Sequence, residues 1–245
     1  MKIKVIACEV FSREFWLAAG ESPHVIDLKF LPFGLHDTPE ELRVQIQQAI
    51  DETDADEYDY IVLGYGLCSR GAAEVRARDI PMVITKAHDC ITLFLGSRAR
   101  YSKEFSASPG TYYFSPGWIE RKEGEMDQGG LEEVKQRMRE ERYAEYVEKY
   151  GEDNAQFLIE QESGWLANYT RAAFINMKIG DIESYREFTK KLADERGWDH
   201  AEIEGDNSLI RRLLNGDWDS DDFLKVPPGQ SITESFDEFI LKVAD

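Results

Sequence analysis

Apolar runs and polar breaks alternate along the first third of the chain in the order typical of strands and helices. Between Thr38 and Glu52, Leu42, Ile46 and Ile50 recur at helical spacing, with Pro39 at the first helical position and a capping box closed by Glu41. A second helix is predicted over residues 69–78. Short continuous apolar runs, each suited to a buried parallel strand, occupy residues 4–7, 26–31, 60–64 and 80–84.

The rest of the chain repeats this alternation after one change of character. Dense charge over residues 123–162 is typical of exposed helices. The pattern predicts an α/β fold with a parallel-sheet, Rossmann-like core in two lobes. We place an N-terminal α/β lobe at 1–122, a charged helical connector at 123–165 and a C-terminal α/β lobe at 166–245. Further strands are predicted at 110–114, 172–176 and 201–204, with an edge strand running into a turn at 223–229, and further helices at 182–196 and 207–214.

The charge of the chain bears on its partners. Its 245 residues include 48 acidic and 29 basic side chains, for a net charge of −19. Such a charge repels phosphate backbones and anionic lipid surfaces, so neither nucleic acid nor a membrane is expected as a partner. The sequence has no apolar stretch near the roughly 20 residues that a membrane helix needs, and its first residues hold no cleavage signal. A cytoplasmic protein is expected.

The three cysteines, Cys8, Cys68 and Cys90, each follow a predicted strand of the N-terminal lobe. Parallel strands end at one edge of their sheet, so the thiols are expected to meet there. Thiolates favour zinc or iron-sulfur clusters, and three of them leave one coordination position open. The pattern therefore predicts a site for a [4Fe-4S] cluster or a zinc ion. The alternative is that each cysteine is a small buried apolar residue.

Polar neighbours of the cysteines are candidates for a fourth ligand or for acid–base chemistry. They are His88 and Asp89 beside Cys90, and Glu9 beside Cys8. A solvated or capping role is the alternative for each of them. The segment GYGLCSRG adds a possible binding loop, in which glycine backbone and a following cation approach a ligand, unless it forms only a tight turn. Its candidate cofactor-binding residues are Gly64, Gly66, Ser69 and Arg70.

Several motifs together resemble a family of bacterial and archaeal proteins, domain of unknown function 1638. They are ACEVF, GYGLCSRG, AHDCITLFLGS, GTYYFSPGW, GDNSLIRRLLNGDW and PPGQSI, and they span nearly the whole chain. The resemblance implies cysteines at the positions of Cys8, Cys68 and Cys90. Members of that family often lie beside corrinoid-dependent methyltransferases. The resemblance therefore implies a role in methyl-group or one-carbon metabolism.

Three functions are compatible with these patterns. The first is a metal- or cluster-dependent enzyme, a transferase or lyase, or an accessory factor, acting on a small molecule. The second is a non-catalytic module that binds a small ligand, a corrinoid protein or a methyltransferase. The third is a thiol enzyme with a cysteine nucleophile activated by His88 or by a helix N-terminus.

Overall fold

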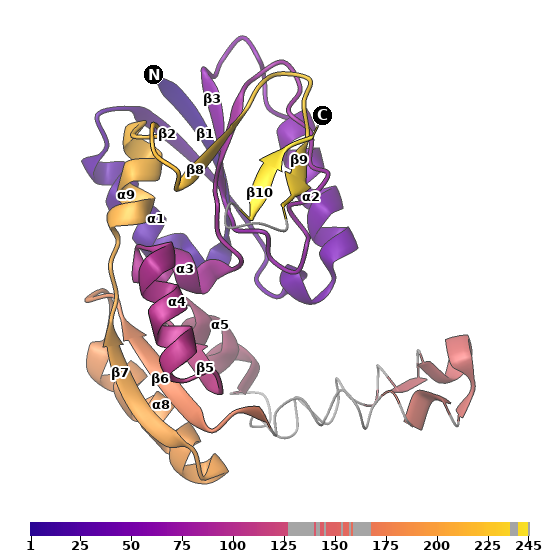
Figure 1. Cartoon of the computed structure of the whole chain (residues 1–245), viewed down its shortest axis with the longest axis vertical. Helices are drawn as coiled ribbons and strands as arrows, with labels where there is room; N and C mark the ends of the chain where they lie inside the picture. Colours follow the sequence, from indigo (N-terminus) through magenta and orange to yellow (C-terminus); the bar gives the residue numbers. More distant parts are fainter. Residues whose placement is uncertain are drawn as a thin grey trace.

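The computed structural model of the chain contains two sheets, joined by helices that lie between them (Figure 1). The predicted connector lies largely outside the described residues. No helix among those described is long and apolar enough to cross a membrane. The structure describes residues 1–126, 140, 143–144, 146–152, 154–156, 158, 168–235 and 240–244.

The first sheet has five strands in the order β2-β1-β3-β4-β8. The first four are parallel, and β8 pairs with β4 in the antiparallel sense. The strands are β1 (Lys2–Cys8), β2 (Val25–Leu31), β3 (Tyr60–Gly64), β4 (Met82–Thr85) and β8 (Phe223–Val226).

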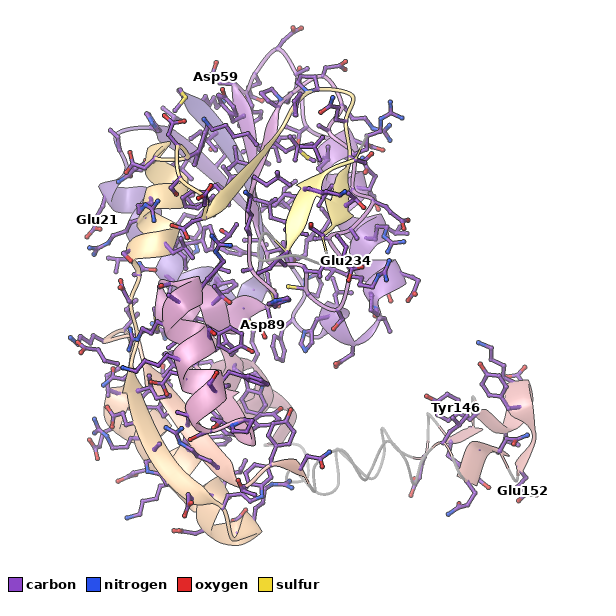
Figure 2. All side chains as sticks on the ribbon, viewed as in Figure 1. Glu21, Asp59, Asp89, Tyr146, Glu152 and Glu234 are labelled. Carbon is purple, nitrogen blue, oxygen red and sulfur yellow. The ribbon has the colours of Figure 1, made fainter. Side chains whose placement is uncertain are left out.

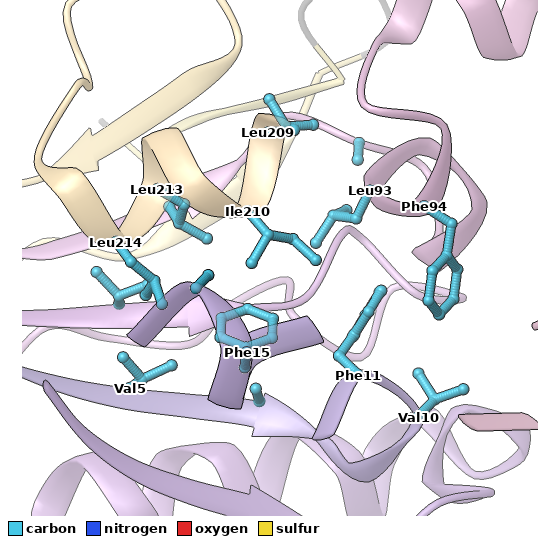
Figure 3. Packing of buried hydrophobic residues seen from close by; sticks show 14 of the residues in the cluster. Val5, Val10, Phe11, Phe15, Leu93, Phe94, Leu209, Ile210, Leu213 and Leu214 are labelled. Carbon is cyan, nitrogen blue, oxygen red and sulfur yellow. The ribbon is translucent and has the colours of Figure 1, made fainter. Parts of the chain in front are cut away.

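Alternate residues of these strands enter two different cores, as the two-residue period of a strand requires. Ile3 and Val5 of β1 pack in one core with helices α1, α3 and α9 (Figure 3), whereas Ile6 packs in the other with α2 and a C-terminal hairpin. Both faces are therefore covered, which explains the continuous apolar runs. These elements are α1 (Ser12–Glu21), α2 (Pro39–Asp51), α3 (Cys90–Leu95), α9 (Ser208–Asn215) and the hairpin β9 (Ile232–Glu234) with β10 (Leu241–Val243).

The second sheet is entirely parallel, in the order β5-β6-β7. Phe114, Phe174 and Leu192 belong to a third core, which joins this sheet to α5 and α8. Its elements are β5 (Thr111–Phe114), α5 (Pro116–Met126), β6 (Arg171–Asn176), α8 (Ile182–Arg196) and β7 (Asp199–Glu204), while α4 (Arg98–Ala107) and two 3-10 turns, η1 (Glu9–Phe11) and η2 (Leu35–Asp37), complete the description.

The structure confirms the α/β class with its largely parallel, Rossmann-like sheet. The predicted helix at 69–78 is wrong, because the chain there forms consecutive turns. Two strands also join the sheet of the other predicted lobe. The β5 strand pairs with β6 rather than with the first sheet, and β8 returns from the second lobe to pair with β4. The chain therefore passes between the sheets twice.

Candidate functional site

Three neighbouring strands of the first sheet end in one row. Cys8 is the last residue of β1, and Ala7 lies beside Gly64, the last residue of β3. On the other side of β3, Leu63 pairs with Ile84 of β4. The chain leaving each strand therefore emerges at the same edge, as expected of parallel strands.

The segment that follows β3 stays paired with the segment that follows β4. The backbone N–H groups of Leu67 and Cys68 donate to the carbonyls of Ala87 and His88, at 2.7 and 2.9 Å. Gly66 makes this approach possible, since a Cβ there would lie 2.7 Å from the Ala87 carbonyl oxygen. The pairing holds Cys68 beside the loop that carries Cys90.

Cys68 begins a turn with unusual backbone geometry. Cys68, Ser69 and Arg70 have φ angles of 46°, 54° and 74°, so three successive non-glycine residues are left-handed. Side chains with a Cβ disfavour this region, and such strain persists only where surrounding contacts hold it. A hydrogen bond of 2.9 Å from the Gly71 N–H to the Cys68 carbonyl closes the turn.

Cys90 is the first residue of α3, directly after the residue that caps this helix. Asp89 Oδ1 accepts a 3.0 Å hydrogen bond from the Ile91 N–H, and Oδ2 accepts one of 2.9 Å from the Tyr101 hydroxyl of α4. Figure 2 places Asp89 where the first lobe meets the helices leading to the second. Capping thus fixes both the start of α3 and the position of Cys90.

All three cysteines line one cavity of about 310 Å³ between the two sheets. The strand ends of the first sheet form one wall, and α4, β5 and the start of α5 form the other. The topology therefore brings the three predicted ligands together. Aromatic side chains contribute much of the remaining lining: Phe11, Phe33, Tyr65, Phe94, Tyr101, Phe105, Tyr112, Tyr113, Trp118 and Tyr169.

The three thiols are partly buried. Burial raises the pKa of Cys8 to about 11 and the pKa of Cys68 to about 12. Burial also raises the pKa of Cys90, and the nearby Asp89, Cys68 and Cys8 raise it further. For each thiol a nearby backbone N–H offsets part of this rise in pKa: that of Val10 for Cys8, that of Gly66 for Cys68 and that of Cys90 for its own side chain.

The arrangement was compared with what a metal site needs. Zinc and iron lie about 2.3 Å from a ligating sulfur, so three sulfurs must surround one point closely. Within the described part of the chain, no group of three or more His, Cys, Asp or Glu side chains stands close enough to hold a metal ion. Metal binding at this cavity therefore requires the three sulfurs to come closer together than they stand in this structure.

The predicted polar neighbours lie in different places. Asp89 lines the cavity, whereas His88 is exposed and lines a second cavity, of about 870 Å³, beside α4. Glu9 accepts a hydrogen bond of 3.1 Å from the Phe33 N–H and lies 3.7 Å from Arg121. Of the three candidates, the structure brings only Asp89 to the cavity wall.

The predicted binding residues of the GYGLCSRG segment also lie in different places. Ser69 lines the cavity, and the partly exposed Arg70 turns away to pair with Glu234 at 3.0 Å. A Cβ at Gly64 would lie 2.5 Å from the Ala7 Cβ, so this glycine allows β1 and β3 to pack closely. Close packing within the protein accounts for both Gly64 and Gly66.

Sequence reasoning missed much of the aromatic wall. Tyr112 and Trp118 belong to the GTYYFSPGW motif, but Phe33, Tyr101 and Tyr169 carry no local signal because they reach the cavity from separate elements. Tyr65 directly follows β3, and its side chain is 3% exposed. Its hydroxyl has no hydrogen-bond partner among the described residues.

Comparison with known proteins gives one match. A family model described as a protein of unknown function, DUF1638, matches residues 30–214. This segment includes Cys68 and Cys90, whereas Cys8 lies before it. No curated protein and no solved structure matches the chain. Because the matched segment covers well over half of its length, the chain belongs to the DUF1638 family.

Proposed function

We propose that the cavity holds a metal centre, an iron-sulfur cluster or a zinc ion, bound by Cys8, Cys68 and Cys90 with one coordination position open to a small molecule. The observation that carries this proposal is the meeting of all three cysteines of the sequence at one cavity. They come from three separate strand ends, and indifferent placement would have scattered them over both lobes.

The surroundings of the sulfurs also support the proposal. Backbone N–H groups near the three thiols lower the pKa of each, and hydrogen bonds of this kind stabilise thiolate ligands and tune the clusters they bind. A bound cation would offset the burial that raises the pKa of each thiol. Without one, the raised pKa values keep the thiols protonated at neutral pH, which disfavours an unassisted cysteine nucleophile.

A metal with an open position acts as a Lewis acid on a bound small molecule. Around it, this chain contributes a cavity whose aromatic lining limits access of water. Asp89 and Tyr101, joined by their hydrogen bond, stand on the cavity wall as candidates for holding a proton or orienting a ligand. An enzyme or an accessory factor of methyl-group metabolism, working with a corrinoid protein or methyltransferase, is the setting that we propose.

The experiment is anaerobic purification followed by iron, sulfide and zinc analysis and a visible spectrum. A cluster predicts about four iron and four sulfide per chain with broad brown absorbance, and a zinc site predicts about one zinc. Replacing any one of the three cysteines by serine is expected to remove most of the metal.

The matched control is Thr111→Ser, which also lines the cavity and keeps a hydroxyl to donate to the Ser108 carbonyl. This variant is expected to retain the metal. A reconstituted protein that binds neither iron nor zinc, or three cysteine variants that bind as much metal as Thr111→Ser, would contradict the proposal.

A further inference from the structure

The cavity has a wall chemistry that selects among ligands. Its lining includes aromatic rings, three thiols, the carboxyl group of Asp89 and the imidazole of His36, and no lysine or arginine is among the described residues that line it. Anionic ligands are normally held by such cations or by the N-terminus of a long helix. Helix α3 is only six residues long, and at the start of the longer α5 the Ser115 hydroxyl already accepts a hydrogen bond of 3.3 Å from the Trp118 N–H.

The rings of the second-lobe wall stand at steep angles to one another. The Tyr112 ring lies 5.2 Å from that of Tyr169 at 69°, and 5.9 Å from that of Trp118 at 80°. Edge-to-face neighbours of this kind form the corners of a concave surface. A molecule bound in the cavity can then contact several aromatic rings at once. The negative face of an aromatic ring attracts a cation.

Asp89 supplies a carboxylate on the opposite wall. It accepts hydrogen bonds from Ile91 and Tyr101, and no lysine or arginine forms an ion pair with it in the described part of the chain. A guest cation inside the cavity would pair with this carboxyl group.

Tyr65 adds an unused polar group. Its hydroxyl is buried at the thiol side of the cavity, and no described residue bonds to it. Buried hydroxyls are normally hydrogen-bonded, so this one is available to a polar atom of the guest.

From these observations we infer that the cavity binds a small organic cation, a quaternary or protonated amine, with its charge between the Tyr112 wall and Asp89 and a polar atom within reach of Tyr65. The inference rests on the proposed function in so far as the same cavity serves both. It names the class of molecule that reaches the open position.

The test is isothermal titration of the metal-free protein with choline and with its neutral isostere, 3,3-dimethylbutan-1-ol. The two differ only in a nitrogen cation replaced by carbon, so the comparison isolates the charge. Choline is expected to bind at least about tenfold more tightly. The anion 3,3-dimethylbutanoate is expected to bind more weakly than either.

Two variants test whether Asp89 and Tyr112 recognise the positive charge of choline. Asp89→Asn, which keeps a side-chain oxygen to cap α3, and Tyr112→Leu are each expected to weaken choline binding about tenfold while changing isostere binding much less. Trp16→Leu, on an exposed part of α1, is the control and should leave both affinities unchanged. Two variants on opposite walls keep the test decisive if one of them fails to fold.

Equal affinity for choline and its isostere, tighter binding of the anion, or no binding of choline would overturn the inference. Since the titration uses metal-free protein, its outcome is separate from the metal analysis. If the protein binds iron or zinc but not choline, the proposed function stands and this inference is wrong. If it binds choline but no metal, this inference stands and the proposed function is wrong.

Discussion

The carboxyl group of Glu14 is the most unusual single group outside the cavity. Glu14 lies in α1 with 0% of its surface exposed, and neither carboxyl oxygen has a hydrogen-bond partner among the described residues. Burial raises its pKa from the ordinary 4.5 to about 7. The folded protein therefore holds a proton on Glu14 under conditions in which the unfolded chain has released it.

The sign of the resulting pH dependence follows from linkage. Because the folded pKa is higher than the unfolded one, the stabilising effect of the bound proton is complete below about pH 4.5 and is lost as the pH rises through about 7. Glu14→Gln cannot ionise, so at pH 8 it is expected to exceed the original protein in unfolding free energy by on the order of 2 to 3 kcal/mol. At pH 4.5 the two should nearly coincide.

Urea denaturation at a series of pH values measures this difference. Glu21→Gln is the control, since Glu21 lies in the same helix but pairs at the surface with Arg211 at 3.0 Å. That change should alter the unfolding free energy by less than about 1 kcal/mol. Parallel pH profiles for the original protein and Glu14→Gln would refute the assignment of a buried, proton-binding carboxyl group.

Among the elements, the turn after β3 departs furthest from its sequence pattern. Apolar residues at 72, 73, 75 and 77 suited a helix, yet the left-handed backbone from Cys68 to Arg70 prevents one. Hydrogen bonds to the Ala87 and His88 carbonyls hold this segment in place, and these partners are distant in sequence. Local propensity could not predict the turn, because tertiary pairing determines it.

The elements that did follow from the sequence are those with strong local signals. The helix at Pro39–Asp51 is present, although the Thr38 side chain makes no capping hydrogen bond to the helix, so the predicted capping box does not form. The predicted helix at 182–196 is confirmed as α8, which Asp181 caps and the left-handed Gly197 ends. Helix α1 was missed because its sequence includes Gly20 and mixes polar with apolar residues.

A substitution at Gly66 tests the close approach of the loops after β3 and β4, and one at Gly20 serves as its control. Gly66→Ala places a Cβ against the Ala87 carbonyl and is expected to lower the unfolding free energy by about 1 to 3 kcal/mol, because backbone must shift. Gly20→Ala, in α1 with no atom within 4 Å of the new Cβ, should instead stabilise the protein by about 0.5 to 1 kcal/mol.

Thermal and urea unfolding compare these variants. The Gly66→Ala protein should also bind less metal than Gly20→Ala in the reconstitution described above, since the shift moves Cys68. Equal stability of the two variants would show that the two loops are not held as closely as the structure indicates.

At the scale of the whole molecule, the meeting of the cysteines was predictable and the wall opposite them was not. Three strand ends on one parallel sheet require only the order of elements, which the apolar runs supply. The cavity also needs the position of the second sheet, and that depends on the double passage of the chain between the sheets. Sequence periodicity carries no information on which sheet a strand joins.

The returning C-terminal segment is anchored by Trp218. Its ring is 5% exposed and lies 4.6 Å from that of Tyr60 of β3, and its Nε1 donates to the Leu213 carbonyl at 2.8 Å. Trp218→Ala is expected to lower the unfolding free energy by about 3 to 5 kcal/mol. Trp16→Ala removes a side chain that is 63% exposed and should cost less than about 1 kcal/mol.

Guanidinium denaturation followed by circular dichroism measures both variants. Because β8 is part of the first sheet, Trp218→Ala is expected to destabilise the whole sheet. Its unfolding should remain a single transition, shifted to lower denaturant concentration. A loss no larger than that of Trp16→Ala would mean that the last thirty residues contribute little to the first lobe.

The antiparallel pairing of β8 with β4 also bears on how the chain is made. The ribosome releases β1 to β4 early, but one face of their sheet lacks α9 until residue 215 has emerged, and one edge stays open until β8 has emerged at residue 226. The lobe that is synthesised first is thus the one completed last, with the second sheet free to form in the interval. During that time the nascent chain exposes an unpaired strand edge, the kind of surface that chaperones cover.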